Sequence, residues 1–413
     1  MKTLPMNFLQ ADEQGRLVLP DTEKNKLSIQ PGDKIYFEYS DNGIFLHRPV
    51  SQLSKIYVEP TNMCNLECST CIRHSWTEPA AHMKSEVYGK IISAIESMPV
   101  PPTVFFGGFG EPLFHPEIIP MIQAAKEKSC RVELITNGVL LHEDMIYALG
   151  TAGLDTLWVS IDGATPETYA DVRLGDELPA ILKNLQKLRL MKYQYGWKNP
   201  ILGVSFVLMK RNMGDFSKVV DLSLRTGARK LMVSNVLPYT ESMKKEMVYT
   251  KNMGQFSHRF HTIHLPRMDK TPETMEGLSS VFSHFEIPEI TGTTLSAPYD
   301  TCPFIERGSV SVRCDGKVSP CLPLLHDHVS FLGDTRREVE SHFVGDLAES
   351  GLLDIWNDQE YRKLRERLFG FDFSPCTVCN SCDYPESNVE DCFGSEKPAC
   401  GGCLWAQGFI QCP

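Results

Sequence analysis

Between residue 55 and about residue 237, short apolar runs alternate with longer segments whose apolar residues recur every three or four positions. Runs of four to eight apolar, β-branched or aromatic residues predict buried strands, and the wider spacing predicts amphipathic helices. The predicted strands are Ile56–Glu59, Thr103–Phe106, Val132–Thr136, Thr156–Ile161, Leu202–Leu208 and Lys230–Val236. The predicted helices are Ser85–Met98, Glu117–Lys128, Glu143–Gly150, Leu178–Lys192 and Phe216–Thr226.

This alternation predicts the α/β class, with parallel strands joined by right-handed crossovers. Six strand–helix units are too few to close an eight-stranded barrel, so we expect a partial (βα)6 barrel. In barrels of parallel strands, the chemistry lies at the carboxyl ends of the strands. Polar or cysteine-containing motifs follow several of the predicted strands, and these are the candidate site residues.

The first fifty residues predict a small separate β module. A strand at Gly15–Pro20 precedes a short helix at Asp21–Leu27, and two strands follow, Ile35–Tyr39 and Ile44–His47, joined by a turn at residues 41–43. This order resembles the AbrB/SpoVT-type swapped-hairpin domain, a family that dimerises and binds DNA. Residues 1–50 hold six Lys/Arg and seven Asp/Glu, so their attraction to phosphates is weak. We therefore expect docking or a homodimer rather than binding to nucleic acid.

The predicted domains are residues 1–50, the core at residues 54–300, and a cysteine-rich region at residues 301–413. Inside the core, residues 238–299 are irregular and predict either a helical insertion or a long connection. The composition, with 42% hydrophobic and 23% charged residues, is typical of a folded, water-soluble chain. The net charge of −11 argues against a general nucleic-acid binder. No apolar run has the length of a membrane span, and the N-terminus lacks a secretory signal, so we expect a cytoplasmic protein.

Cysteines are distributed unevenly along the chain. Of the fourteen, none precedes residue 61 and ten lie between Cys302 and Cys412. Without a signal peptide, a disulfide-stabilised secreted protein is disfavoured, and metal ligation is favoured. We expect a reducing, anaerobic cytoplasm. Cys130 stands apart from the others at a strand start and is expected to be a buried core residue.

Three cysteines, Cys64, Cys68 and Cys71, follow the first core strand. Spacings of three and then two residues let one short loop place three thiolates around a cubane [4Fe–4S] cluster, which leaves one iron open to a small molecule. A structural zinc site completed by His74 is the alternative. The triplet resembles the signature of the radical SAM superfamily, whose open iron binds S-adenosylmethionine (SAM). That resemblance implies a radical SAM barrel for residues 54–300.

The second predicted strand ends in the Gly-rich loop, residues 107–112, with the sequence Gly-Gly-Phe-Gly-Glu-Pro. Glycines allow close approach of a ligand, and a carboxylate accepts hydrogen bonds from an ammonium group. The loop resembles the motif that holds the methionyl amine of SAM in this superfamily. The resemblance implies SAM contacts from Gly107, Gly108, Gly110 and Glu111.

Further SAM-binding residues follow from the same resemblance. It implies that Ser160 contacts the ribose, supported by Asn137 and Asp162. Arg173 matches an arginine that pairs with the SAM carboxylate, a task that suits a guanidinium. The alternative for Arg173 is a solvated arginine at the end of a helix.

The C-terminal cysteines resemble the SPASM extension of radical SAM enzymes, which holds auxiliary [4Fe–4S] clusters. Ten thiols offer two sets of four, and zinc-ribbon pairs are the alternative. The first half of the pattern fits well, whereas Cys382, the segment after it, and the short Cys400–Cys403 spacing depart from it. The eight ligands are therefore left open among ten candidates: Cys302, Cys314, Cys321, Cys376, Cys379, Cys382, Cys392, Cys400, Cys403 and Cys412.

Over its whole length the chain resembles the radical SAM/SPASM maturases associated with tungsten-cofactor oxidoreductases of the aldehyde:ferredoxin type. The residues that carry this include Cys71–Trp76 and Asp391–Pro413. The resemblance implies an enzyme that reductively cleaves SAM to a 5′-deoxyadenosyl radical and modifies a protein or peptide, with ferredoxin or flavodoxin as reductant. One alternative is a general SPASM peptide-modifying enzyme that forms a thioether, carbon–carbon or formylglycine product. Another is a redox-sensing DNA-binding regulator, which the acidic N-terminal module disfavours.

Overall fold

The structure, a computed structural model, describes most of the chain: residues 10–26, 29, 32–40, 43–173, 176–249, 263–264, 268–269, 271–272, 274–276, 278, 302–377 and 382–413. Within these ranges no helix has both the length and the apolar character that crossing a membrane requires.

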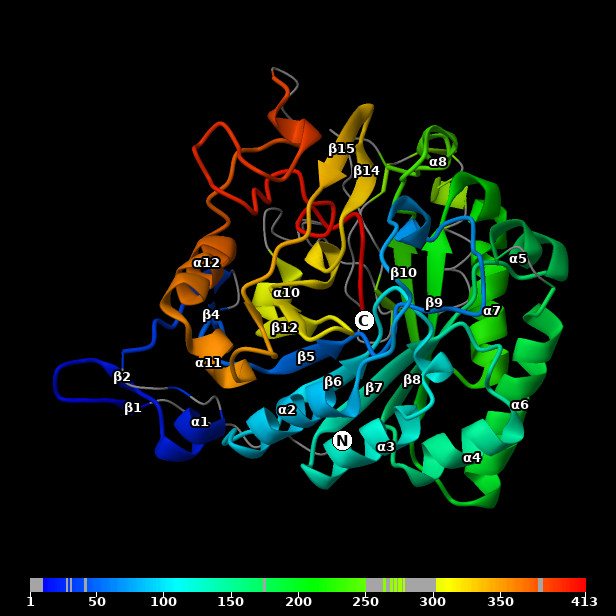
Figure 1. The fold of residues 1–413 in the computed structure, drawn as a ribbon, viewed down its shortest axis with the longest axis horizontal. Coiled ribbons are helices and arrows are strands. Elements are labelled where there is room, and N and C mark those ends of the chain that lie inside the picture. The colour runs from blue at the N-terminus through cyan, green and yellow to red at the C-terminus, as the bar shows by residue number, and fades with distance from the viewer. Residues whose placement is uncertain are drawn as a thin grey trace.

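Six parallel strands form the centre of the main sheet and confirm the predicted α/β core (Figure 1). They are β5 (Lys55–Val58), β6 (Thr103–Phe106), β7 (Arg131–Thr136), β8 (Thr156–Ser160), β9 (Ile201–Leu208) and β10 (Lys230–Asn235). Neighbours pair in order along the chain, from β5 to β10. The predicted strand bounds differ from these by one residue at most.

Helices cover the outer face of this sheet (Figure 1). They are α2 (Ser85–Glu96), α3 (Ile118–Glu127), α4 (Glu143–Thr151), α6 (Leu178–Gln194) and α7 (Phe216–Thr226), and a short α5 (Pro166–Arg173) follows β8. Side chains alternate along each strand because successive residues point to opposite faces. Ile56 and Val58 pack with the apolar stripes of the helices, whereas Tyr57, Phe105 and Trp158 belong to a second core on the inner face.

Among the residues that the structure describes, the main sheet has ten strands, four more than the sequence predicted. A two-residue strand, β11 (Ile263–His264), pairs with β10. At the opposite edge, β12 (Ser309–Val312) runs parallel to β5, followed by β13 (Lys317–Ser319) and β16 (Gly345–Asp346). The cysteine-rich region thus extends the core sheet. The predicted boundary at residue 300 stays a prediction. Most of the segment 238–299 lies outside the described residues, apart from residues 238–249, which include α8 (Glu241–Lys244), the strand β11 and a few positions between 268 and 278.

The rest of the C-terminal region lies beside the β12 edge of the sheet, with the hairpin of its next two strands above the barrel (Figure 1), and Trp356 and Arg365 donate to the carbonyls of Ser51 and Val50 just before β5. It contains α10 (Pro303–Glu306), the hairpin of β14 (His328–Leu332) and β15 (Thr335–Val339), α11 (Leu352–Asn357) and α12 (Gln359–Gly370).

The final residues enter the inner core of the barrel. The carbonyl of Phe409 accepts hydrogen bonds from the backbone and side chain of Asn235. The carbonyl of Pro413 accepts hydrogen bonds from Lys55 and Tyr57 of β5.

The described part of the N-terminal module contains the predicted element types. It comprises the pair β1 (Gln10–Ala11) and β2 (Leu17–Val18), the helix α1 (Asp21–Lys26), and the pair β3 (Phe37–Ser40) and β4 (Gly43–Leu46). The rings of Tyr36 and Phe369 lie 4.3 Å apart and join the module to α12. The resemblance to AbrB-type domains stays a prediction.

Candidate active site at the carboxyl ends of the parallel strands

Cys64, Cys68 and Cys71 lie in the cysteine loop, residues 60–71, between β5 and the short helix η1 (Ile72–Ser75). The backbone N–H of Cys71 donates to the carbonyl of Cys68, and that of Leu66 points to the sulfur of Cys64 at 3.4 Å. Burial raises the pKa of Cys64 and of Cys71, and the neighbouring thiols raise it further. Uncompensated thiolates are therefore disfavoured, and a cation is needed to stabilise them.

The zinc alternative for this loop receives no support. The Nε2 atom of His74 lies 3.1 Å from the carbonyl of Cys68, and its Nδ1 atom lies 3.8 Å from the carboxylate of Glu67. A single zinc ion draws thiolates to about 2.3 Å and so brings their sulfurs close together. Among the residues that the structure describes, no group of three or more His, Cys, Asp or Glu could hold one metal ion. Thiolates around a cubane bind different irons and need not approach so closely.

The Gly-rich loop packs directly against the residues before Cys64. The backbone N–H of Glu111 donates to the carbonyl of Met63 at 2.8 Å. A Cβ atom on Gly110 would overlap the carbonyl of Thr61, and Gly108 has a φ of +106° against the side chain of Glu59. Only glycine avoids both problems. These glycines therefore hold two strand-end loops in contact.

Glu111 is fully buried and fixed by backbone donors. Its Oε1 atom accepts from the N–H of Leu113 at 3.0 Å, and its Oε2 atom accepts from the N–H of Asn137 at 2.7 Å. Burial raises the pKa of Glu111, and these hydrogen bonds oppose that shift. The Thr136 side chain is a third hydrogen-bond partner, and because two carboxylate oxygens can accept about four hydrogen bonds, Glu111 keeps capacity for a ligand ammonium.

Asn137 joins the end of β7 to the cysteine loop. Its Nδ2 atom donates to the side chain of Asn65 at 2.8 Å and lies 3.9 Å from the sulfur of Cys64. Ser160 is the last residue of β8 and pairs with Ser205 of β9. The structure thus places Asn137 beside the triplet and Ser160 at the neighbouring strand end.

Arg173 is largely buried, with 12% of its side chain exposed, which contradicts the alternative of a solvated helix-end arginine. Its NH2 atom pairs with Asp162 Oδ2 at 2.5 Å, and its NH1 atom lies 3.4 Å from the sulfur of Cys68. Burial alone would lower the pKa of Arg173, but Asp162 and Cys68 together raise it. The guanidinium therefore lies between a strand-end carboxylate and a predicted cluster ligand.

The donor set and its unused polar atoms fit the cluster and SAM. Within the described part of the chain, Asp162 Oδ2 and Arg173 Nε are buried without a hydrogen-bond partner, apart from the Arg173–Asp162 ion pair. Because Asp162 Oδ2 is taken up by that ion pair, the unused group is the Arg173 Nε donor, which matches the acceptor atoms of a polar ligand. Cys64, Cys68 and Cys71 would hold the cluster, and Glu111 and Arg173 would face the ammonium and carboxylate groups of SAM.

Four cysteines of the C-terminal region come together. Cys302, Cys321, Cys400 and Cys403 line one cavity. Burial raises the pKa of all four thiols, and neighbouring thiols of this set raise those of Cys302, Cys321 and Cys400 further. Arg337, also buried, borders this cavity and donates to the carbonyls of Pro385 and Ala399. These four thiols form the best-defined set for an auxiliary cluster.

The other C-terminal cysteines are less closely grouped. The sulfur of Cys376 lies 3.0 Å from the hydroxyl of Ser374, and Cys392 is among the groups that raise the pKa of Cys376. Cys382 and Cys392 are exposed. Cys412 accepts from the indole N–H of Trp405 at 3.2 Å, with Cys403 nearby. Cys379 lies outside the described residues.

Two cysteines lie in the main apolar core. After burial, the largest influences on the pKa of Cys314 are Glu59 and Asp315 rather than other thiols. Cys130 is fully buried, as predicted. None of the thirteen described cysteines is in a disulfide.

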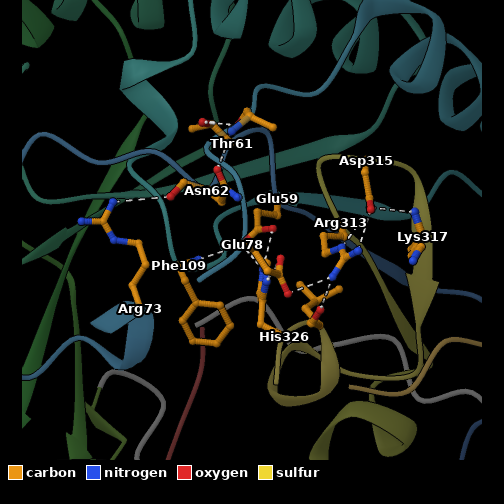
Figure 2. A network of polar contacts seen from close by, with 12 residues as sticks. Glu59, Thr61, Asn62, Arg73, Glu78, Phe109, Arg313, Asp315, Lys317 and His326 are labelled. Carbon is orange, nitrogen blue, oxygen red and sulfur yellow. Dashed lines mark hydrogen bonds and ion pairs between the residues drawn. The ribbon is translucent and has the colours of Figure 1, made fainter. Parts of the chain in front are cut away.

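Sequence reasoning missed one group of residues at this edge, centred on His326. Its ring contacts Glu59 after β5 and Glu78 after η1 (Figure 2). Trp76 stacks on the face of the ring. A histidine in the apolar run after Cys321 was the available signal. The sequence could not show that its partner lies 267 positions away.

Comparison with known proteins agrees with this geometry. A family profile described as "Radical SAM superfamily" matches residues 58–222, and one described as "SPASM: Iron-sulfur cluster-binding domain" matches residues 302–383. The "tungsten-containing aldehyde ferredoxin oxidoreductase cofactor-modifying protein" of Pyrococcus furiosus is 28% identical over 369 residues, covering 87% of this chain and 96% of the relative. The "AdoMet-dependent heme synthase" of Methanosarcina barkeri is 25% identical over 362 residues, covering 84% and 89%.

Two solved structures share the fold. SuiB of Streptococcus suis bound to S-adenosylmethionine aligns with a TM-score of 0.54 at 17% identity, over 80% of this chain and 71% of SuiB. Native anSMEcpe with bound AdoMet aligns with a TM-score of 0.53 at 14% identity, over 86% and 96%. Together with the two matching profiles, the parallel strands and the cysteine loop after β5, these findings show that the chain belongs to the radical SAM superfamily and is an enzyme with a C-terminal SPASM domain.

Proposed function

We propose that this enzyme binds a [4Fe–4S] cluster through Cys64, Cys68 and Cys71, cleaves SAM reductively, and modifies a protein or peptide. One observation carries this proposal. The three thiols, the Gly-rich loop with Glu111, and the buried Arg173 lie at the same edge of the barrel. This is the edge at which parallel barrels hold their substrates.

The chemistry divides between the bound groups and the chain. When bound, the cluster supplies an electron to SAM, whose cleavage gives methionine and a 5′-deoxyadenosyl radical that removes a hydrogen atom from the substrate. The chain orients SAM and excludes water. Glu111 would hold the ammonium group in an orientation fixed by two backbone N–H donors. Arg173 would hold the carboxylate while Asp162 fixes the guanidinium.

For the substrate, we propose a role in maturing a tungsten-containing oxidoreductase of the aldehyde:ferredoxin type. The Pyrococcus furiosus relative, whose name states such a role, aligns with nearly its whole length, from the radical SAM core through the SPASM region. A general peptide-modifying role is the second candidate, because SuiB, a structural neighbour, has been solved with its precursor peptide. Auxiliary clusters at Cys302, Cys321, Cys400 and Cys403 and at the remaining cysteines would carry the substrate electron.

The SAM-cleavage step is tested on the full chain, purified and reconstituted without oxygen. With dithionite and SAM, the wild type is expected to form 5′-deoxyadenosine, and the triple variant Cys64→Ala, Cys68→Ala, Cys71→Ala is expected to form none. Cys130→Ala is the matched control, because this thiol is buried in the helix-side core. Undiminished cleavage by the triple variant would overturn the proposal.

The substrate is tested by anaerobic capture and by turnover. We expect the immobilised enzyme to retain a tungsten oxidoreductase from the same organism and to couple 5′-deoxyadenosine formation to its activation. Retention and modification of a small precursor peptide instead would support the second candidate. Ferredoxin or flavodoxin is the proposed reductant, replacing dithionite in the same assay.

We further propose that the N-terminal module forms a homodimer. The exposed apolar side chains Leu17, Phe37, Tyr39 and Ile44 on its strands support this. Light scattering that gives only the 46.6 kDa of one chain would contradict the dimer.

A further inference from the structure

The side chain of His326 is completely buried and has a polar partner at each ring nitrogen. Its Nε2 atom lies 2.9 Å and 3.1 Å from the two carboxylate oxygens of Glu59. Its Nδ1 atom lies 2.8 Å from Glu78 Oε2. The ring centroids of Trp76 and His326 lie 4.2 Å apart in a stacked arrangement, and Phe109 meets the His326 ring edge-on (Figure 2). The ring is therefore held in both position and orientation.

The partners of His326 flank the cysteine loop or belong to the Gly-rich loop, the two loops that form the proposed SAM site. Glu59 lies between β5 and the cysteine loop, and Trp76 and Glu78 follow that loop. Phe109 lies inside the Gly-rich loop. His326 itself belongs to the SPASM region, between β13 and β14. One side chain of the SPASM domain thus connects both loops of the barrel.

Glu59 transmits this contact to the Gly-rich loop. Its Oε1 atom accepts from the backbone N–H of Phe109 at 3.1 Å. The backbone at Gly108 packs closely against the Glu59 side chain, because a Cβ atom on Gly108 would lie 2.7 Å from it. A change in the orientation of Glu59 would therefore move the loop that ends in Glu111.

The charges around His326 favour its doubly protonated form. Glu59 and Glu78 face its two nitrogens, and Trp76 and Phe109 carry no charge. Arg313 from the end of β12 pairs with Glu78 at 3.2 Å and with Asp315. An imidazolium donates from both nitrogens and can satisfy both carboxylates at once, whereas a neutral ring donates from only one. Removing the imidazolium would leave the carboxylate of the fully buried Glu59 without a counter-charge. An unpaired buried charge destabilises a protein strongly.

We propose that His326 is a positioning residue for SAM: by bridging Glu59 and Glu78, it holds the Gly-rich loop against the cysteine loop, so that the SPASM domain shapes the SAM site. This inference rests on the proposed SAM-binding function of those loops. It goes beyond that function because it assigns the SPASM region a role that its cluster ligands do not perform.

The test compares His326→Gln with the wild type and with His342→Gln. His342 is a partly buried histidine of the same region, and it lies in a cavity formed by α12 and Phe343. The Kd of SAM is measured by anaerobic equilibrium dialysis, and KM and kcat by 5′-deoxyadenosine formation. We expect the Kd and the KM for SAM to rise about tenfold in His326→Gln, with kcat and iron content retained, a change of one decade in affinity. His342→Gln is expected to match the wild type.

A second variant distinguishes the loss of a positioning contact from unfolding of the site. In Glu59→Gln/His326→Gln the amide oxygen can still accept from Phe109, and no buried carboxylate is left unpaired. We expect the double variant to recover most of the lost affinity, a non-additivity that a merely unfolded site would not show. If the His326→Gln variant fails to bind iron, Glu78→Gln is measured in its place. This variant loses only the contact of Glu78 with His326 Nδ1, and we expect the KM for SAM to rise about threefold.

The outcomes distinguish this inference from the proposed function. If the wild type cleaves SAM and the Kd and KM of His326→Gln equal those of His342→Gln, the positioning role is overturned and the function stands. An unchanged KM in Glu78→Gln, where that variant is used, overturns it equally. A wild type that neither binds nor cleaves SAM overturns the function, and this inference with it.

Discussion

Arg173 and Asp162 form an ion pair of 2.5 Å beyond the end of β8, in which the Asp162 side chain is buried and 12% of the Arg173 side chain is exposed. Asp162 is also fixed by the backbone N–H of Val207 at 2.9 Å. The pair holds a guanidinium beside Cys68, so it contributes to both the stability and the chemistry of the site.

Arg173→Gln should destabilise the protein strongly. Removing the guanidinium leaves Asp162 charged and buried, and breaking a buried pair in this way costs about 3–5 kcal/mol. The measurement is the free energy of unfolding of the iron-free protein in guanidinium chloride. Arg211→Gln is the matched control, because Arg211 pairs with Glu246 and Asp171 in a more exposed position and should lose less than about 1 kcal/mol. Equal losses in the two variants would contradict the prediction.

Gly110→Ala should disturb the Gly-rich loop. The new methyl group would overlap the carbonyl of Thr61 and come within 2.7 Å of that of Met63, and backbone atoms move only at high cost. We expect the KM for SAM to rise or cleavage to be lost. Gly89→Ala, in the exposed middle of α2 with nothing within 4 Å of the new methyl, should leave SAM cleavage unchanged and stabilise the helix by about 0.5–1 kcal/mol. Normal cleavage by Gly110→Ala would contradict the close packing of the two loops.

Cys321→Ala and Cys314→Ala should differ in iron content. Cys321 lies with three other thiols, so its loss should remove an auxiliary cluster and about four irons per chain. Cys314 lies in the apolar core beside Glu59, so its loss should remove none. Iron analysis and the visible absorption of anaerobically reconstituted protein measure both. A loss of iron in Cys314→Ala would place this residue among the ligands.

The stability of the protein should depend on pH in two opposite ways. The carboxylates of Glu59 and Glu78 outweigh desolvation and raise the folded pKa of His326, so its contribution is complete below the unfolded value of about 6.5 and is lost as pH rises through the folded pKa. Burial lowers the pKa of His328 and of His342 to about 4, so their contribution is complete above about pH 6.5 and is lost as pH falls toward 4. Unfolding of the iron-free protein at a series of pH values measures both windows. In His326→Gln, the dependence of the unfolding free energy on pH should disappear only in the window above about pH 6.5. An unchanged slope in that window would contradict the raised pKa of His326.

The core of the fold could be predicted because each strand and helix carries its own pattern. The β6 and α7 bounds were predicted to the residue, since apolar alternation and the glycine after Thr226 are local signals. The four added strands could not be predicted. β12 resembles any short polar-apolar run, and only its pairing with β5, some 250 residues earlier, makes it part of the main sheet.

The residues of the candidate site also divide into those with a local sequence signal and those that meet only through packing. Cysteine spacing and glycines are visible in a sequence, so Cys64 and Glu111 could be named with their neighbours. Partners that meet only in space could not, as with His326 and Glu59. The grouping of Cys302 and Cys321 with Cys400 and Cys403, and the separation of Cys314 from them, also depends on packing that no spacing rule contains.

The passage of residues 409–413 through the inner core has a consequence for how the enzyme is made. Domains usually fold as they leave the ribosome, from the N-terminus onward. Here Tyr57 and Asn235 on the inner wall of the barrel gain the carbonyls of Pro413 and Phe409 as acceptors only after those residues have been synthesised. The cysteine loop is therefore translated more than 300 residues before the inner core of the barrel is complete.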